Sequence, residues 1–143
     1  MPIVGYTINK INAEKLKQID NKIMVDHSFK ITSIEKEKLK TGTKEEILKF
    51  FFDYNVEYKE GFGNIKMNGF ISFLDEPKAL KTILDNWKKD KKVDPELMKN
   101  ILNTILVHCG IKALAISQDL NLPPHIRMPT LEIVKQDAKE YIG

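Results

Sequence analysis

Three histidines and one cysteine are the side chains of this 143-residue chain best suited to metal binding or nucleophilic chemistry. His108 and Cys109 are adjacent in a segment of helical periodicity, so they point about 100° apart and lack the i, i+4 spacing of a chelating pair. His27 lies on the apolar face of a predicted strand, where we expect a hydrogen-bonded core or interface histidine, and His125 follows two prolines. We therefore expect no metal site and no catalytic residue.

Motifs of catalysis and nucleotide binding are absent: the sequence contains no GxSxG, P-loop, GxGxxG, HExxH or CxxC pattern. Carboxylate pairs such as Glu45 and Glu46 lie in charged segments, where nothing adapts them to general acid–base work. We expect a protein that is not an enzyme and that uses no cofactor. The alternatives are a small-molecule-binding or enzymatic α+β domain with a cleft between sheet and helix, and a structural adaptor oligomer.

The positive charge is almost all lysine, since Arg127 is the only arginine and the net charge is +3. Lysine cannot clamp phosphate in a bidentate fork. The segment KFFFDYNVEYK interleaves aromatic residues with lysine, as platforms for single-stranded nucleic acid do. Phe50, Phe52, Tyr54 and Tyr58, however, share the strand face that must form the core. We expect no nucleic-acid partner.

The compartment is indicated by a single cysteine, which cannot form an internal disulfide, and by an N-terminus without the pattern of a leader. No uninterrupted apolar run approaches the roughly 18 residues of a membrane span. We expect a cytoplasmic protein without direct membrane insertion.

Period-two alternation predicts four strands between about residues 3 and 74. The first, up to residue 16, alternates weakly and suggests a bulge, and the second changes parity at Ile34. The third alternates over residues 48–58 and the fourth over 65–73, where both faces are partly apolar. Short polar turns between successive strands predict an antiparallel meander. Part of the face that the helices leave open would then meet another subunit.

Helical periodicity begins after Asp75. One helix is expected from Pro77 to the lysine run 88–92, and a second from DPEL at residues 94–97 through Gly110, a possible bend. A short third helix is expected over residues 131–141. The fold is predicted as α+β in a single domain, 1–143, with strands about 3–74 and two or three helices, about 76–142, on one sheet face.

The stiff, apolar stretch LNLPPHIRMP, residues 120–129, follows the second helix. Its prolines hold aliphatic side chains in place at low conformational cost, so it can line a groove. An ordinary loop packed over the sheet is the alternative.

The order of elements, with NGFISF at residues 68–73, a long helix through Gly110, and LNLPP at residues 120–124, resembles the SecB export chaperone family. The resemblance implies an ATP-independent holdase, a dimer or tetramer of identical chains, that binds unfolded or preprotein clients in hydrophobic grooves. Client-binding residues would be Leu120, Leu122, Pro124, Ile126, Phe50 and Phe52. Ile65 and Met67 would lie at the oligomer interface.

Two departures from the family pattern bear on partners. SecB proteins are typically acidic and dock the motor SecA through carboxylates, whereas this chain is basic overall, which argues against SecA-type docking. The predicted second helix also continues past Gly110 with KALAISQD, where the family is shorter.

Overall fold

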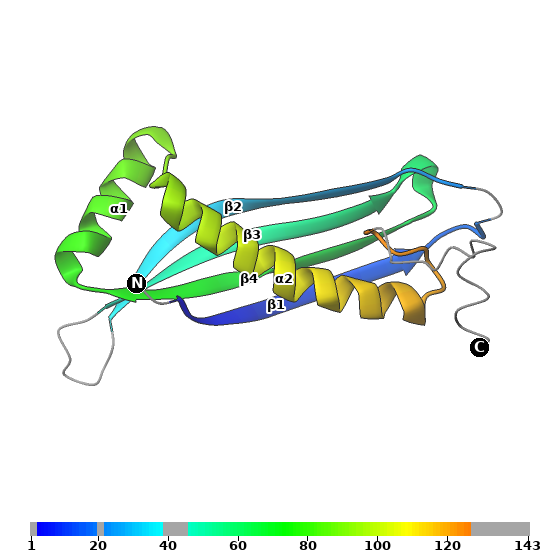
Figure 1. Ribbon diagram of the computed structural model, residues 1–143, viewed down its shortest axis with the longest axis horizontal. Helices are drawn as coiled ribbons and strands as arrows, with labels where there is room; N and C mark the ends of the chain where they lie inside the picture. Colours follow the sequence, from blue (N-terminus) through cyan, green and yellow to red (C-terminus); the bar gives the residue numbers. More distant parts are fainter. Residues whose placement is uncertain (1–2, 20–21, 39–45, 127–143) are drawn as a thin grey trace, which may run out of the picture.

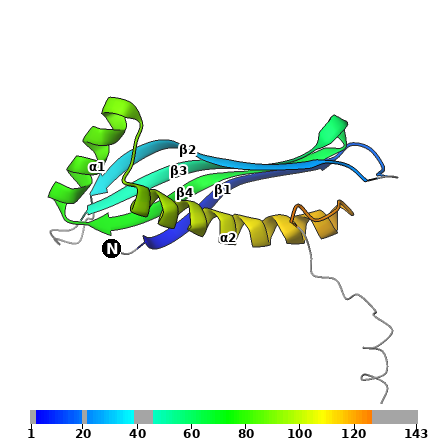
Figure 2. The same cartoon turned by 45° about the horizontal axis from the view of Figure 1, so that its top comes forward.

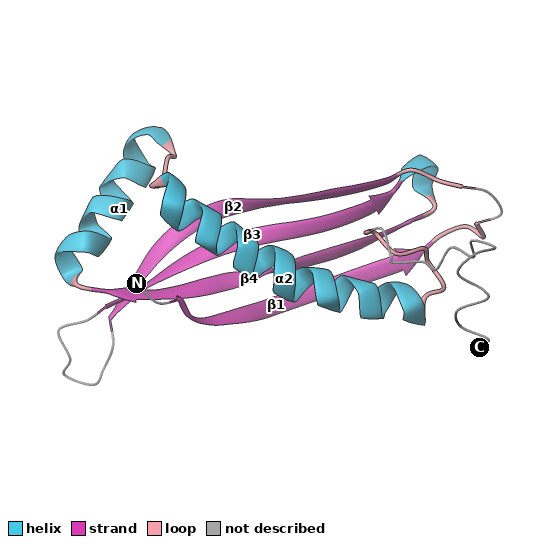
Figure 3. Cartoon of the chain, viewed as in Figure 1, coloured by secondary structure: helices cyan, strands magenta, loops and turns pink. Residues whose placement is uncertain are grey.

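The computed structural model describes residues 3–19, 22–38 and 46–126. These residues form an antiparallel four-stranded sheet followed by two helices, which confirms the predicted α+β class (Figures 1 and 3). The expected third helix lies outside the described residues. The elements are β1 (Ile3–Lys15), β2 (Val25–Lys38), β3 (Glu46–Tyr58), β4 (Gly63–Asp75), α1 (Pro77–Asp90) and α2 (Pro95–Asp119), with a 3-10 turn at Lys59–Gly61.

The strand order is β1-β4-β3-β2, so the predicted meander is wrong for β1. β2, β3 and β4 are sequential neighbours, but β1 pairs with β4 on the far side, as in a Greek key. The connection between β1 and β2, described over residues 16–19 and 22–24, joins the two edge strands of the sheet. Nine residues reach roughly 30 Å, more than the ~14 Å of three strand spacings, so this path is open to the chain.

Bulges explain both irregular patterns seen in the sequence. β1 changes register against β4 between Ile3 and Gly5 and again between Ile8 and Lys10, as its weak alternation predicted. β2 changes register against β3 between Ile31 and Ser33, which accounts for the parity change at Ile34. An extra residue on one strand moves the following side chains to the other face.

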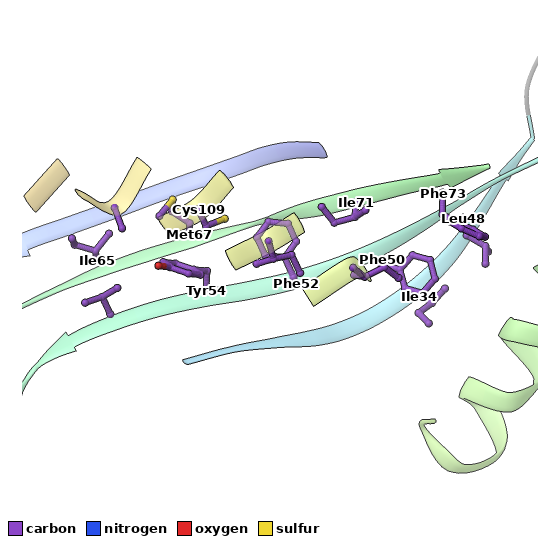
Figure 4. Close-up of a cluster of buried hydrophobic side chains, with 14 of the residues drawn as sticks. Ile34, Leu48, Phe50, Phe52, Tyr54, Ile65, Met67, Ile71, Phe73 and Cys109 are labelled. Carbon is purple, nitrogen blue, oxygen red and sulfur yellow. The ribbon is translucent and has the colours of Figure 1, made fainter. Parts of the chain in front are cut away.

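The hydrophobic core lies between one face of the sheet and α2 (Figures 2 and 4). The alternating residues of β3 and β4 on this face are 0–2% exposed. α2 contributes Ile101, Ile105, Cys109 and Ala113, one residue every turn, and α1 adds Leu80 and Trp87. α2 crosses the sheet diagonally, so its stripe of buried residues meets several strands (Figure 1).

Both helices begin as the sequence predicted. α1 starts with Pro77, and α2 starts with Pro95 after Asp94, whose carboxylate accepts the backbone N–H of Leu97 at 3.3 Å. α2 continues through Gly110 as a single element of 25 residues. Within the described residues, α2 is the one helix whose length and apolar content would suit a membrane span, a property that core helices of soluble proteins share.

β4 is central rather than an edge strand, and this changes the environment of Ile65 and Met67. Their side chains face α2 and are 0% and 2% exposed within one chain. A partner subunit would therefore meet other residues. The expectation came from the resemblance to the SecB family, which placed these two residues on the strand used for assembly.

Candidate binding groove beside the proline-rich segment

The segment Leu120–Ile126, here called the strap, leaves α2 and lies over the end of the sheet (Figure 1). The Leu122 backbone N–H donates to the Ser117 carbonyl at 2.8 Å, and Asn121 has a positive φ of 54° that turns the chain. The Leu122 side chain is 5% exposed and lies close to Gly63 of β4. The Tyr58 hydroxyl donates to the Pro123 carbonyl at 2.6 Å. These contacts fix the strap on the sheet.

A groove of about 800 Å³ lies between the strap and the connection that joins β1 to β2. Ile19 and Ile23 line it from the connection, and Leu122 and Pro123 from the strap. Leu16 and Met24, at the two ends of the connection, are 59% and 73% exposed. This strap groove is open and largely apolar, with Lys22, Gln118 and Asn121 as its polar lining residues. Such a surface suits an extended apolar segment.

His125 brings the strap against two strands. Its Nε2 lies 3.1 Å from the Tyr54 hydroxyl, and its ring centroid is 4.9 Å from that of His27 on β2. Among the described residues, His27 Nε2 and His125 Nδ1 are buried without a hydrogen-bond partner, so His27 is not the satisfied core histidine that was expected. Burial lowers the pKa of both imidazoles, and the neighbouring His27 lowers the pKa of His125 further.

The other titratable groups of this cluster remain protonated near neutrality. Burial raises the pKa values of Tyr54 and Tyr58 and raises the pKa of the Cys109 thiol to about 11. Cys109 is thus a core residue on α2, with little thiolate to act as a nucleophile.

The six predicted client-binding residues separate into two groups. Phe50 and Phe52 are 0% and 1% exposed beneath α2 and belong to the core (Figure 4). The strap residues lie together: Leu122 lines the groove from a buried position, Leu120 is half-buried, Pro124 is exposed and Ile126 is 45% exposed.

The connection before β2 contributes groove residues that the sequence did not indicate. Ile19 is part of the otherwise polar stretch QIDN, residues 18–21, and Ile23 follows two positions after it. The sequence predicts only a short polar turn here, and apolar residues in and beside such a turn are a weak signal, since hairpins also have them. What brings these residues to the strap is the crossing of the sheet end by this connection.

A second exposed apolar surface follows the outer edge of β1 and the adjoining side of α2. The Tyr6 ring stacks on His108 with centroids 3.9 Å apart and an interplanar angle of 23°. Ile11 on β1 and Val107 and Ile111 on α2 are 44%, 55% and 65% exposed. We call Tyr6, Ile11, Val107 and Ile111 the edge strip. Within the described chain, it lies on a sheet edge without a strand partner.

Metal ligands do not converge in the part of the chain that the structure describes: no group of three histidine, cysteine or carboxylate side chains is close enough to hold an ion. His108 stacks at the surface on Tyr6, whereas the neighbouring Cys109 is 1% exposed in the core. Their divergence follows from their adjacent positions on the helix.

Comparison with solved structures gives a neighbour for this arrangement. The Mycobacterium tuberculosis Rv1957 SecB-like chaperone, solved in complex with a ChAD peptide from the Rv1956 HigA1 antitoxin, superposes with a TM-score of 0.52. The alignment covers 93% of this chain and 91% of that chain at 8% sequence identity. The fold is SecB-like.

At this identity the similarity concerns the fold, and function has to be argued from the site. No family model matches the chain, and no curated protein matches it. The neighbour is a chaperone, and its structure holds a peptide.

Proposed function

We propose that this protein is an ATP-independent holdase that binds apolar segments of non-native polypeptides in the strap groove. The observation that supports this most directly is the open groove of about 800 Å³ lined by Ile19, Ile23, Leu122 and Pro123. Burying apolar client side chains there is favourable without demanding one client sequence. The SecB-like fold and the peptide held by the neighbour support the same function.

The alternative of a ligand site between sheet and helix has less support. The side chains between β3 and α2, including Phe50, Phe52, Ile101 and Ile105, are 0–1% exposed and pack closely. A small-molecule site at that interface would require a cavity, whereas this space is filled by the core (Figure 4). The exposed apolar surfaces instead favour macromolecular binding.

A homo-oligomer is the second part of the proposal, and the edge strip is the surface that supports it. A 13-residue edge strand bearing half-exposed Tyr6 and Ile11 beside Val107 and Ile111 offers both unpaired backbone groups and apolar area. Assembly would place several strap grooves in one particle and let one client bind at several points. We propose that this assembly acts in the cytoplasm, where delivery of preproteins for export is one use of such a holdase.

The experiment that tests the holdase is light scattering from a chemically unfolded client diluted into buffer with increasing amounts of this protein, without nucleotide. Suppression that saturates at a fixed stoichiometry is expected. Ile23→Asp, at a half-buried position that lines the groove, should weaken suppression by about tenfold, the loss expected when one large apolar contact disappears.

Val4→Asp is the matched control, because Val4 is 49% exposed at the opposite end of β1 from the groove. It should leave suppression unchanged. Equal activity of wild type, Ile19→Asp and Ile23→Asp would argue against the strap groove, and no suppression by wild type would argue against the holdase. Leu122→Asp, which the sequence suggests as a groove variant, is unsuitable because its 5% exposed side chain anchors the strap.

Assembly is tested separately by size-exclusion chromatography with multi-angle light scattering. Ile111→Glu should shift the protein to a smaller particle, because a charge at an apolar interface is costly to desolvate. Asn103→Glu, an exposed position on the same helix, should leave the mass unchanged. A monomeric wild-type protein would exclude assembly through the edge strip.

A further inference from the structure

The face of the sheet opposite α2 carries three exposed lysines on three strands: Lys10 on β1, Lys66 on β4 and Lys30 on β2. We call them the basic band. Lys10 and Lys30 share one cross-strand row through Asn68 and Asp53, so they are three strand spacings, or about 14 Å, apart. Lys66 lies in the next row, between Asn12 and Asn55.

A hollow of about 480 Å³ contains this band, with Lys10, Lys30 and Lys66 among its lining residues. Asp53 is its one acidic lining residue, and it forms no ion pair with another described residue. The three lysines likewise form none with any described side chain, unlike Lys36 on β2, Lys49 on β3 and Lys59 directly after β3. The hollow therefore carries a net positive charge, with three lysines against one carboxylate.

Uncharged donors lie between these lysines. The carboxamides of Asn12, Asn55 and Asn68 line the same hollow, and Asn55 Oδ1 is buried without a partner in the described chain. A carboxamide can donate to a carboxylate and accept from a peptide N–H. The surface thus offers groups both for acidic side chains and for a peptide backbone.

The neighbouring rows limit the size of a ligand. On one side the next row contains Glu14, Glu57 and Asp26. On the other side it contains Phe51 and Phe70, whose ring centroids are 5.4 Å apart. A polyanion running along the strands would leave the band after two rows and meet carboxylates. A ligand crossing the strands meets about 14 Å of band, the length of four or five extended peptide residues.

We propose that the basic band binds a short acidic segment of a partner polypeptide, lying across the strands with an apolar residue beside Phe51 and Phe70. Lysine pairs well with single carboxylates, and the band contains none of the arginine forks that favour phosphate. Base stacking on the aromatic pair is hindered because Lys49 Nζ lies 4.6 Å from the Phe70 ring centroid. These features favour an acidic peptide over a single-stranded nucleic acid.

This surface is distinct from the strap groove, since it lies on the sheet face that neither described helix covers (Figure 2). The inference goes beyond the holdase and does not depend on it. Binding of an acidic segment here would leave the groove free for a client.

The test is fluorescence anisotropy at neutral pH and low salt with a labelled, glutamate-rich peptide that carries one phenylalanine. Wild type should bind it, and added salt should weaken binding because the charges are exposed. The triple variant Lys10→Gln, Lys30→Gln, Lys66→Gln should bind about tenfold more weakly, the combined effect of three exposed charge pairs.

A second triple variant, Lys78→Gln, Lys81→Gln, Lys99→Gln, removes the same charge from exposed helix positions and should change affinity less than about twofold. An equal loss in both variants would show attraction by net charge alone and overturn the proposal. Absence of peptide binding by wild type would overturn it too, as would tighter binding of an oligouridine of equal charge. Aggregation suppression by the first variant should match wild type, which separates this surface from the holdase.

Discussion

The Tyr58 hydroxyl on β3 donates a hydrogen bond of 2.6 Å to the carbonyl oxygen of Pro123. This contact joins residues 65 positions apart and ties the strap to the last residue of a strand. Pro123 lines the groove, and the bond therefore connects sheet and groove directly.

Tyr58→Phe should loosen the strap without disturbing the core. It removes the donor and leaves the ring in place, so we expect a loss of about 1–2 kcal/mol in strap stability. Amide hydrogen exchange at Leu122, whose N–H donates to the Ser117 carbonyl, measures this directly. Tyr6→Phe, a half-exposed position on β1, is the control. Unchanged protection in Tyr58→Phe would show that the bond does not hold the strap.

Leu122→Ala should destabilise the attachment of the strap by about 2 kcal/mol or more, since a side chain only 5% exposed loses its contacts beside Gly63. Ile126→Ala, in the same segment but 45% exposed, should change stability by less than about 0.5 kcal/mol. Urea denaturation together with exchange at the Leu122 amide measures both. Similar effects from the two substitutions would contradict the anchoring role of Leu122.

Acid should release the strap. Burial lowers the pKa values of His27 and His125 in the closed strap, whereas in an opened strap they would return toward about 6.5. Opening is then coupled to proton uptake, so the closed form is fully stable above about pH 6.5 and loses stability as the pH falls below it. Tyr54, Tyr58 and Cys109, with raised pKa values, stay protonated throughout this range.

Protection of the Leu122 amide, corrected for intrinsic exchange, should therefore be lower at about pH 5 than at about pH 7.5. His27→Phe removes one titrating group and its influence on His125, so the pH dependence should become shallower. Equal protection at the two pH values in wild type would rule out this coupling.

The individual strands and helices were predictable because the periodicity of their apolar residues can be read from neighbouring residues. Strict alternation in β3 and the Asp-Pro start of α2 specify a strand and a helix from neighbouring residues alone. The core aromatic residues of β3 followed from the same alternation. The segment LNLPP was also recognised, since prolines between leucines are visible without a structure.

The strand order was not predictable, because the connection between β1 and β2 is long enough either to turn back or to cross the sheet. Its crossing makes β4 central, buries Ile65 and Met67, and brings Ile19 and Ile23 to Leu122. The approach of His125 to His27 likewise depends on where the strap lies. The side of the candidate groove lined by Ile19 and Ile23 therefore could not be predicted from local sequence patterns.

Gly69 shows how closely β1 must approach β4 for this order to form. A Cβ added at Gly69 would lie 1.9 Å from the Thr7 carbonyl oxygen and 2.9 Å from Ile8 Cα, both backbone atoms of β1 beside its second bulge. Neither can move without disturbing the strand pairing. Gly69→Ala should therefore lower the free energy of unfolding by about 3 kcal/mol or more.

Gly5→Ala is the matched control, because a Cβ at Gly5 meets no atom within 4 Å on the same pair of strands. Its effect should stay within about 0.5 kcal/mol. Urea denaturation gives the two free energies, and amide exchange in β1 locates the loss. If Gly69→Ala were as mild as Gly5→Ala, β1 would not pair tightly at this point. The edge strip, whose Tyr6 and Ile11 flank the bulge, would then lack a fixed position for assembly.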